Sequence, residues 1–264
     1  MITGSMRSSS KSSPSGSDVD DPASSRHGGW SAVLSPQRAN FFDSGRHILN
    51  VAVDRLFETK LKRQWTCRDC NAVNQMREAN FGLQIPIGNR RYDSLKRLSE
   101  CIREYFAPEN LTVRCNSAKC GGKDAQRARG AFITSAPEIL VIQIIRMGYN
   151  PRTGNTFKVR DRVQIDEVLE LSDYTTRLAG TDVNKALRYQ LHGVVSHVGE
   201  TLQLGHYIAT VRCQNGVDFA TVNDSHVEYL KTSKERALKS LDTQDLQSYI
   251  VMYQKVGGDM AKCI

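Results

Sequence analysis

The spacing of apolar side chains predicts two helices in the first half of the chain. Apolar residues recur at helical spacing from about His47 to Glu58. A second such run follows Asp93, a residue suited to cap a helix, and stops before Pro108. We interpret both apolar stripes as faces that pack on a core. Their members are Leu49, Val53, Leu56 and Phe57 in the first helix, and Leu95, Leu98, Ile102 and Tyr105 in the second.

From residue 131 onward the pattern becomes typical of strands. Residues 139–145 are a run of branched apolar side chains of strand length, which predicts a central strand buried on both faces. Residues 187–197 and 248–253 predict two more strands, with a short helix at about 233–241 before the last one. The mixture of helices and strands, with no internal repeat, indicates an α+β fold rich in antiparallel strands.

A β-hairpin is the clearest local prediction. Two apolar-rich segments, 204–212 and 217–225, flank an Asn-Gly pair, which is a strong hairpin signal. Folding the chain about this pair places residues whose numbers sum to about 431 opposite each other, so that His206 faces the far end of the second segment. An imidazole beside a carboxamide or a carboxylate is the base and its orienting partner in a catalytic triad. The candidate catalytic residues are therefore His206, Asn223 and Asp224.

Composition predicts a disordered tail and argues against a membrane segment. Residues 1–40 are rich in Ser, Gly, Pro and Asp, with Trp30 as the one candidate anchor, so they contain too little apolar surface to fold. The mean hydropathy of the chain is −0.44. No apolar run approaches the roughly 18 residues of a membrane span, and no secretory signal is evident. We expect an intracellular protein, cytoplasmic or nuclear, without a membrane partner.

The net charge of +8 does not by itself indicate nucleic acid. Lys and Arg are spread along the whole chain, and no basic run is interleaved with aromatic residues. We therefore expect no nucleic-acid partner. Nucleic-acid binding through a zinc ribbon is the least favoured of the functions considered.

The seven cysteines point to metal binding. An odd number of cysteines without a secretory signal favours reduced thiols over a disulfide framework. Two close pairs, Cys67 with Cys70 and Cys115 with Cys120, suit a tetrahedral Zn²⁺ held by two turns of the chain. Because four thiolates leave no open position, the zinc would be structural and would join two β-ribbons that lack a core. The alternative is four unligated thiols.

Taken in order, several segments resemble the ubiquitin-specific protease family of cysteine deubiquitinases. Each motif is weak alone, but their succession is specific and covers about residues 45–256. In the segment at 137–146 the usual Phe after the last residue is replaced by Met147. The matching segments are 56–57, 67–70, 94–111, 115–120, 137–146, 158–163, 189–199, 205–207, 223–227 and 249–253.

The resemblance implies a papain-like cysteine protease fold with an antiparallel palm sheet and zinc-ribbon fingers. It implies thiol-dependent hydrolysis of isopeptide bonds at the ubiquitin C-terminus, with ubiquitin or a ubiquitinated protein as partner. His206 would be the general base, Asn223 would orient it, and Asp224 would be a further acidic partner. Gly205 and Tyr207 would line the channel for the ubiquitin tail. We interpret His192 and His197 as structural and His226 as exposed.

The family's nucleophile lies in a cysteine box before the first zinc pair, and no cysteine here precedes Cys67. The sequence Gly-Asn-Thr-Phe at 154–157 matches part of that box, but Phe157 replaces the cysteine and we treat the match as coincidence. Cys101 is expected to be buried in its helix, Cys213 is roughly 20 Å from the base along an extended strand, and Cys263 lies in a tail. We therefore predict that the chain alone is inactive.

Three explanations for this pattern stay open. The chain is a fragment or truncated gene model of an active enzyme, a naturally shortened inactive relative that binds ubiquitin or scaffolds a complex, or one of two polypeptides that share the fold. In each case most of the family's thumb is missing. The expected organisation is a tail at 1–40, a remnant of a thumb helix at 41–62, zinc-bearing fingers with a helix at 63–130, a palm with the His box at 131–256, and a tail at 257–264.

Overall fold

The computed structural model describes residues 44–87, 95–175, 187–230, 233–243 and 246–258. The predicted N-terminal tail with Trp30, the predicted helix cap Asp93 and the C-terminal Cys263 lie outside these ranges. The described residues belong to one compact unit. They form a mixed α+β fold that is mostly sheet, as the sequence predicts.

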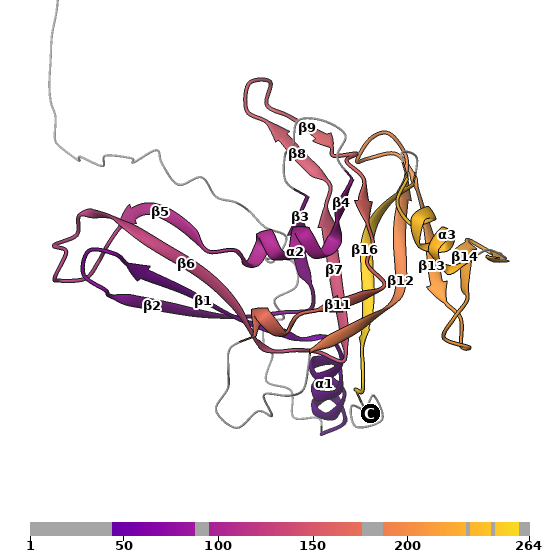
Figure 1. Cartoon of the computed structure of the whole chain (residues 1–264), viewed down its shortest axis with the longest axis horizontal. Coiled ribbons are helices and arrows are strands. Elements are labelled where there is room, and N and C mark those ends of the chain that lie inside the picture. Colours follow the sequence, from indigo (N-terminus) through magenta and orange to yellow (C-terminus); the bar gives the residue numbers. More distant parts are fainter. Residues whose placement is uncertain (1–43, 88–94, 176–186, 231–232, 244–245, 259–264) are drawn as a thin grey trace, which may run out of the picture. The chain divides into compact units, whose positions relative to one another are not determined.

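The largest sheet has eight strands and is almost entirely antiparallel. Seven strands follow the order β15-β14-β13-β12-β16-β7-β3, and β11 pairs with β12 (Figure 1). The single parallel pairing in this sheet is β3 with β7. The strands are β3 (Leu83–Pro86), β7 (Ile139–Ile145), β11 (Val168–Glu170), β12 (Arg188–Val198), β13 (His206–Arg212), β14 (Phe219–Asn223), β15 (His226–Tyr229) and β16 (Leu246–Lys255).

The central strand β7 is buried on one face only. Leu140, Ile142 and Ile144 are buried, whereas the alternate residues Val141 and Gln143 are half-buried. The prediction that both faces are buried is therefore wrong for the described residues. The reason is that a run of branched apolar residues does not reveal whether a second layer covers the strand.

A second sheet of four antiparallel strands has the order β2-β1-β6-β5 (Figure 1). Its β1 and β6 contribute Leu61 and Ile133 to the main core, while its far end has only a small cluster of Cys67, Cys115 and Ala125. In the described residues, that end therefore has little apolar core beyond its cysteines. The strands are β1 (Thr59–Cys67), β2 (Val73–Asn80), β5 (Glu109–Arg114) and β6 (Asp124–Ser135).

Two short sheets complete the strands. The strands β4 (Lys96–Arg97) and β10 (Val163–Gln164) pair in parallel. The hairpin of β8 (Met147–Asn150) and β9 (Asn155–Lys158) is antiparallel and precedes the short 3₁₀ helix η2 (Ser172–Tyr174). The hairpin matters for the site because Lys158, its last strand residue, reaches the strand that leads to His206.

The described residues include three α-helices, α1 (Ser44–Phe57), α2 (Leu98–Phe106) and α3 (Lys234–Ser240). These agree in place with the predicted helices, and the Ser233 hydroxyl caps α3 by accepting from the Arg236 N–H. Among these helices none has the length and apolar character needed to cross a membrane.

The start of α2 and two of the predicted stripe positions differ from the sequence prediction. The helix starts at Leu98 because the preceding residues Lys96 and Arg97 pair as strand β4 with β10. Leu95 is 52% exposed and Val53 is 38% exposed, so neither is part of a core face. The helix does end before Pro108, and Leu98, Cys101 and Ile102 are buried as predicted.

Candidate functional site

The predicted hairpin forms with the predicted register. Ala209 pairs with Val222 and Arg212 with Phe219, and both pairs satisfy the sum of 431. At the tip, the Gly216 N–H donates to the Cys213 carbonyl, and Gly216 adopts a φ of +70°, which favours glycine. The Asn-Gly signal therefore fixes which residues lie opposite each other, although the turn is longer than two residues.

At the open end of the hairpin, three polar side chains come together. The His206 Nε2 atom lies 2.6 Å from Asn223 Oδ1 and 3.8 Å from Asp224 Oδ2. The His206 side chain is 45% exposed and Asp224 is 81% exposed, so the group faces solvent. Asp224 has a φ of +51°, and this backbone turn brings its carboxylate back toward the ring. The structure thus brings the three candidate catalytic residues together.

This contact assigns the protonation of the neutral imidazole. A carboxamide oxygen can only accept, so His206 Nε2 must donate to Asn223 Oδ1. The other nitrogen, Nδ1, is then unprotonated and can accept a proton. The arrangement is chemically that of a base held by an orienting amide.

Gly205 lies against a second histidine. A Cβ atom at Gly205 would come within 2.2 Å of His197 Nε2 and 2.4 Å of the Val198 carbonyl. His197 is buried, as its structural interpretation predicts, and His226 is exposed, as predicted. His192, for which the sequence also predicts a structural role, is exposed. The close approach to His197 is therefore a physical reason for glycine at position 205.

Tyr207 is exposed beside the base. Its ring centre lies 4.9 Å from that of His197, which is its partner across β12 and β13, and 6.1 Å from that of Tyr249. The Tyr207 ring thus contacts the rings of His197 and Tyr249, while about half of the residue is exposed to solvent. This exposed residue directly follows His206 in β13.

No described cysteine is beside His206. Four of the described cysteines belong to the cluster at the far end of the second sheet, and Cys101 is buried in α2. Cys213 follows the opposite end of β13, at the hairpin tip. The described residues therefore supply no thiol at His206 Nδ1.

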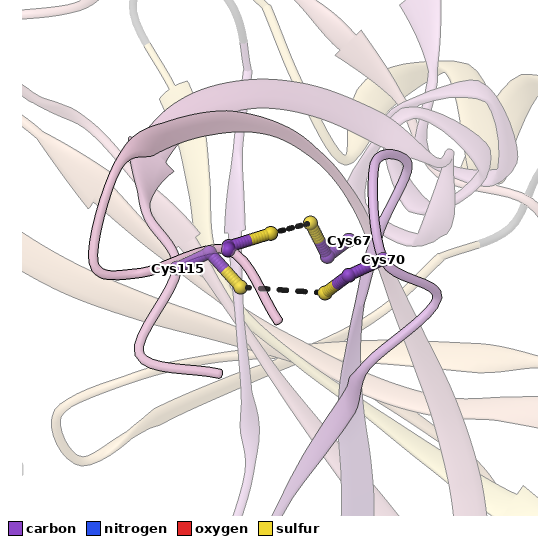
Figure 2. Close-up of side chains that lie close together, drawn as sticks. Cys67, Cys70 and Cys115 are labelled. Atoms are coloured by element: carbon purple, nitrogen blue, oxygen red, sulfur yellow. Dashed lines mark hydrogen bonds between the residues drawn. The ribbon is translucent and has the colours of Figure 1, made fainter. Parts of the chain in front are cut away.

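The four paired cysteines converge although the two pairs are far apart in sequence. The Sγ atoms of Cys67, Cys70, Cys115 and Cys120 all lie within 4.8 Å of one another. Cys67 and Cys70 flank the turn between β1 and β2, whereas Cys115 and Cys120 follow β5. Figure 2 shows side chains of the two turns pointing toward each other.

The distances between sulfur atoms fit a metal site. Cys67 Sγ lies 3.7 Å from Cys120 Sγ. Cys70 Sγ lies 3.8 Å from Cys115 Sγ, a contact that Figure 2 marks with a dashed line. In a tetrahedral Zn–thiolate site with bonds of about 2.3 Å, neighbouring sulfur atoms are about 3.8 Å apart. The four cysteines could hold a metal ion of this kind.

Local hydrogen bonds favour the charged form of one of these thiols. The Ala72 N–H, followed by the Cys120 thiol, lowers the pKa of Cys70 to about 6. A thiolate is the form that binds metal, so the turn after Cys70 is suited to ligation. The contact with the Cys70 thiol, together with burial and the other two thiols, raises the pKa of Cys120, so the support for a metal site is the set of four thiols and the spacing of their Sγ atoms.

Sequence reasoning gave no role to Lys158 beyond its fit to the family segment. In the structure, the Lys158 ammonium reaches the carbonyl of His197 and lies close to the connection that leads to His206. Its membership of segment 158–163 was the available signal. That signal does not reveal which atoms the side chain contacts.

Comparison with known proteins extends these findings. The family model described as ubiquitin carboxyl-terminal hydrolase matches residues 39–253. The chain is 29% identical over 165 residues to ubiquitin carboxyl-terminal hydrolase 7 of Drosophila melanogaster. The matched region covers 62% of this chain and 14% of the fly protein. It is 26% identical over 197 residues to Ubl carboxyl-terminal hydrolase 18 of Mus musculus, which covers 68% of this chain and 52% of the mouse protein.

A solved structure has the same fold. The chain is similar, with a TM-score of 0.63 and 24% identity, to one in the structure of the SAGA Ubp8/Sgf11/Sus1/Sgf73 DUB module bound to ubiquitin aldehyde. The match covers 77% of this chain and 42% of that chain. The chain therefore spans less than two thirds of the length of these relatives.

Proposed function

This chain belongs to the ubiquitin carboxyl-terminal hydrolase family, and from that membership we propose that it is the C-terminal part of a deubiquitinase domain that cleaves isopeptide bonds at the ubiquitin C-terminus. The observation that carries the proposal is the 2.6 Å contact between His206 Nε2 and Asn223 Oδ1. Because this contact leaves Nδ1 as the accepting nitrogen, it gives the family's base a free side toward a thiol.

In each half of the proposed reaction His206 accepts one proton and donates one. Nδ1 takes the proton from a cysteine thiol, and the thiolate attacks the carbonyl carbon of the terminal glycine of ubiquitin. The tetrahedral intermediate breaks its C–N bond as the imidazolium donates that proton to the leaving lysine amine. Water then hydrolyses the thioester, again with Nδ1 as base, which restores the thiol and releases the ubiquitin carboxylate.

Asn223 and Asp224 have separate proposed roles. Asn223 accepts from Nε2–H and so fixes the tautomer and the orientation of the ring. The Asp224 carboxylate lies 3.8 Å from the same nitrogen and is proposed as a second polar partner of the ring. Gly205 and Tyr207 are proposed to border the ubiquitin tail.

The nucleophile is proposed to come from outside the described residues. Six of the seven cysteines are described, and none of these is placed to deliver a thiol to His206. Because the seventh, Cys263, belongs to the tail predicted at 257–264, the isolated chain is proposed to be inactive in hydrolysis. This same observation favours a second candidate function, a catalytically inactive module that binds ubiquitin or scaffolds a complex.

The cysteine cluster is proposed to bind one structural Zn²⁺ through Cys67, Cys70, Cys115 and Cys120. A bound ion would join the ends of the finger strands, which have almost no other core. We also propose the division into fingers at 63–130 and palm at 131–256. Strand β1 crosses the border at the start of the fingers, and strand β6 crosses the border between fingers and palm.

A ubiquitin–fluorophore cleavage assay tests the proposal. The purified chain is expected to show no turnover, and turnover that His206→Ala abolishes would contradict the predicted inactivity. Addition of a polypeptide that carries the family's cysteine box is expected to produce turnover in the wild type but not in His206→Ala. If that mixture stays inactive while the chain still binds ubiquitin, the binding-module function is favoured instead.

A further inference from the structure

The connection between β12 and β13 leads directly into His206. Residues 199–205 join the two strands, and Val198 pairs with His206 where the connection closes. The conformation of this connection therefore determines the position of His206, the first residue of β13. Such a connection needs contacts of its own, because exposed loops open at little free-energy cost unless other groups hold them.

The side chain of Lys158 supplies such contacts from the β8–β9 hairpin. Its Nζ atom lies 2.5 Å from the Gly199 carbonyl, 3.4 Å from the His197 carbonyl and 2.6 Å from Gln247 Oε1. An ammonium group has three donors, and these three oxygen atoms can satisfy all of them. The cation thus joins the end of β12, the start of the connection, and β16.

The partners of Lys158 are neutral, which is unusual for a half-buried cation. Among the described residues, no carboxylate lies within 4 Å of Lys158 Nζ. Burial lowers the pKa of Lys158, and the charges of Arg146 and Arg160 lower it further. Keeping a half-buried charge without an opposite charge costs stability, so such a group is a candidate for a role beyond packing.

The same connection also closes against the His197 ring. A Cβ atom at Gly199 would lie 2.5 Å from the Leu204 carbonyl, and one at Gly205 would lie 2.2 Å from His197 Nε2. A Cβ atom at Gly199 would also lie 3.3 Å from His197 Cε1, so both ends of the connection approach the His197 ring, and the carbonyl of His197 accepts from Lys158. Movement of the Lys158 ammonium away from the His197 and Gly199 carbonyls would loosen this packing.

We propose that Lys158 is a positioning residue that holds residues 199–205 against His197 and so maintains the contact of His206 with Asn223. This inference rests on the proposed role of His206 as a base. Lys158 acts through the Gly199 carbonyl and does not touch the reacting atoms. The β8–β9 hairpin and the connection to His206 are consequently coupled, because one ammonium group joins them.

The test uses Lys158→Met, which keeps the length of the side chain and removes its three donors. Hydrogen exchange of residues 199–205 is expected to become about tenfold faster, the loss expected for a hydrogen-bonded charged group. Histidine ¹⁵N spectra are expected to show His206 changing from one Nε2–H tautomer to a mixture. The matched control is Lys255→Met, because Lys255 bonds Glu138 at the opposite end of β16 and should change neither measurement.

A second variant keeps the inference testable if Lys158→Met does not fold. Gln247→Met removes one oxygen from the ammonium and leaves the cation in place, so exchange in residues 199–205 should rise by about threefold. Unchanged exchange and an unchanged His206 tautomer in a folded variant would overturn the inference. Both measurements use the chain without ubiquitin, so failure of the inference is distinct from failure of the proposed function, which ubiquitin binding and hydrolysis report.

Discussion

Arg146 and Asp242 form a buried ion pair that joins the end of β7 to the segment before β16. Arg146 Nη2 lies 2.5 Å from Asp242 Oδ2, and each side chain is only 2% exposed. Arg146 also donates to the carbonyls of Ser248 and Asp161. Burial raises the pKa of Asp242 although the Arg146 charge opposes this shift. Each charge therefore needs the other to offset the cost of its burial.

The first prediction is that Asp242→Asn destabilises the fold by about 3–5 kcal/mol, because it leaves the Arg146 charge buried and unpaired. The free energy of unfolding in urea measures the loss. Glu170→Gln is the control, since the Glu170–Arg188 pair is exposed and should contribute less than about 1 kcal/mol. Equal losses in the two variants would contradict the prediction.

The second prediction concerns the packing of Gly205 on His197. Gly205→Ala is expected to lower the free energy of unfolding by about 1–3 kcal/mol, because the added methyl group overlaps His197 Nε2 and the Val198 carbonyl. In a His197→Ala background the same substitution should cost less, since one of the two clashes is removed. A double-mutant cycle measures this difference, and strictly additive effects would show that the two residues do not interact.

The third prediction concerns the pH dependence of stability. Burial, and to a lesser degree Lys158, lowers the pKa of His197 in the folded state. The unfolded chain therefore binds a proton near pH 6.5 that the folded chain resists, so stability should fall as the pH decreases through about 6.5. Urea unfolding at about pH 7.5 and about pH 5.5 measures the loss, which should be smaller for His197→Gln. A loss of equal size in both proteins would exclude His197 as its source.

The fourth prediction is that the chain purifies with about one zinc per molecule, and that Cys115→Ser removes it. Metal analysis by mass spectrometry measures the content. Cys213→Ser should retain the zinc, because Cys213 lies at the hairpin tip, outside the cluster. Hydrogen exchange should then increase in β1 and β5 of Cys115→Ser but not in β7 and β16, since the main core does not depend on the metal. Wild-type protein without zinc would contradict the assignment.

The hairpin and the cysteine cluster could be predicted because both follow from local rules. An Asn-Gly turn determines register, and register places His206 near the segment from Asn223 to Ser225 at the other end. The two cysteines of each pair have the spacing of metal ligands, and two such pairs together supply the four ligands of a tetrahedral Zn²⁺ site. The roles of these residues in a reaction do not follow from register or spacing.

The remaining features could not be predicted because they depend on contacts between distant segments. Helix α2 begins at Leu98 rather than after Asp93, because Lys96 and Arg97 pair with a strand more than sixty residues later in the chain. The Lys158 ammonium meets carbonyl groups about forty residues away, and backbone acceptors leave no trace in the sequence. Leu95 fits an apolar stripe but is exposed.

The most direct test of the account is a titration of ¹⁵N-labelled ubiquitin with the unlabelled chain. We predict saturable chemical-shift changes that are largest in the C-terminal Gly-Gly segment of ubiquitin, and that weaken in Tyr207→Ala. Ubiquitin shortened by its last residues should bind more weakly, because its tail would no longer reach the segment beside His206. Absence of saturable changes up to about 1 mM chain, which corresponds to a binding free energy weaker than about −4 kcal/mol, would contradict the account.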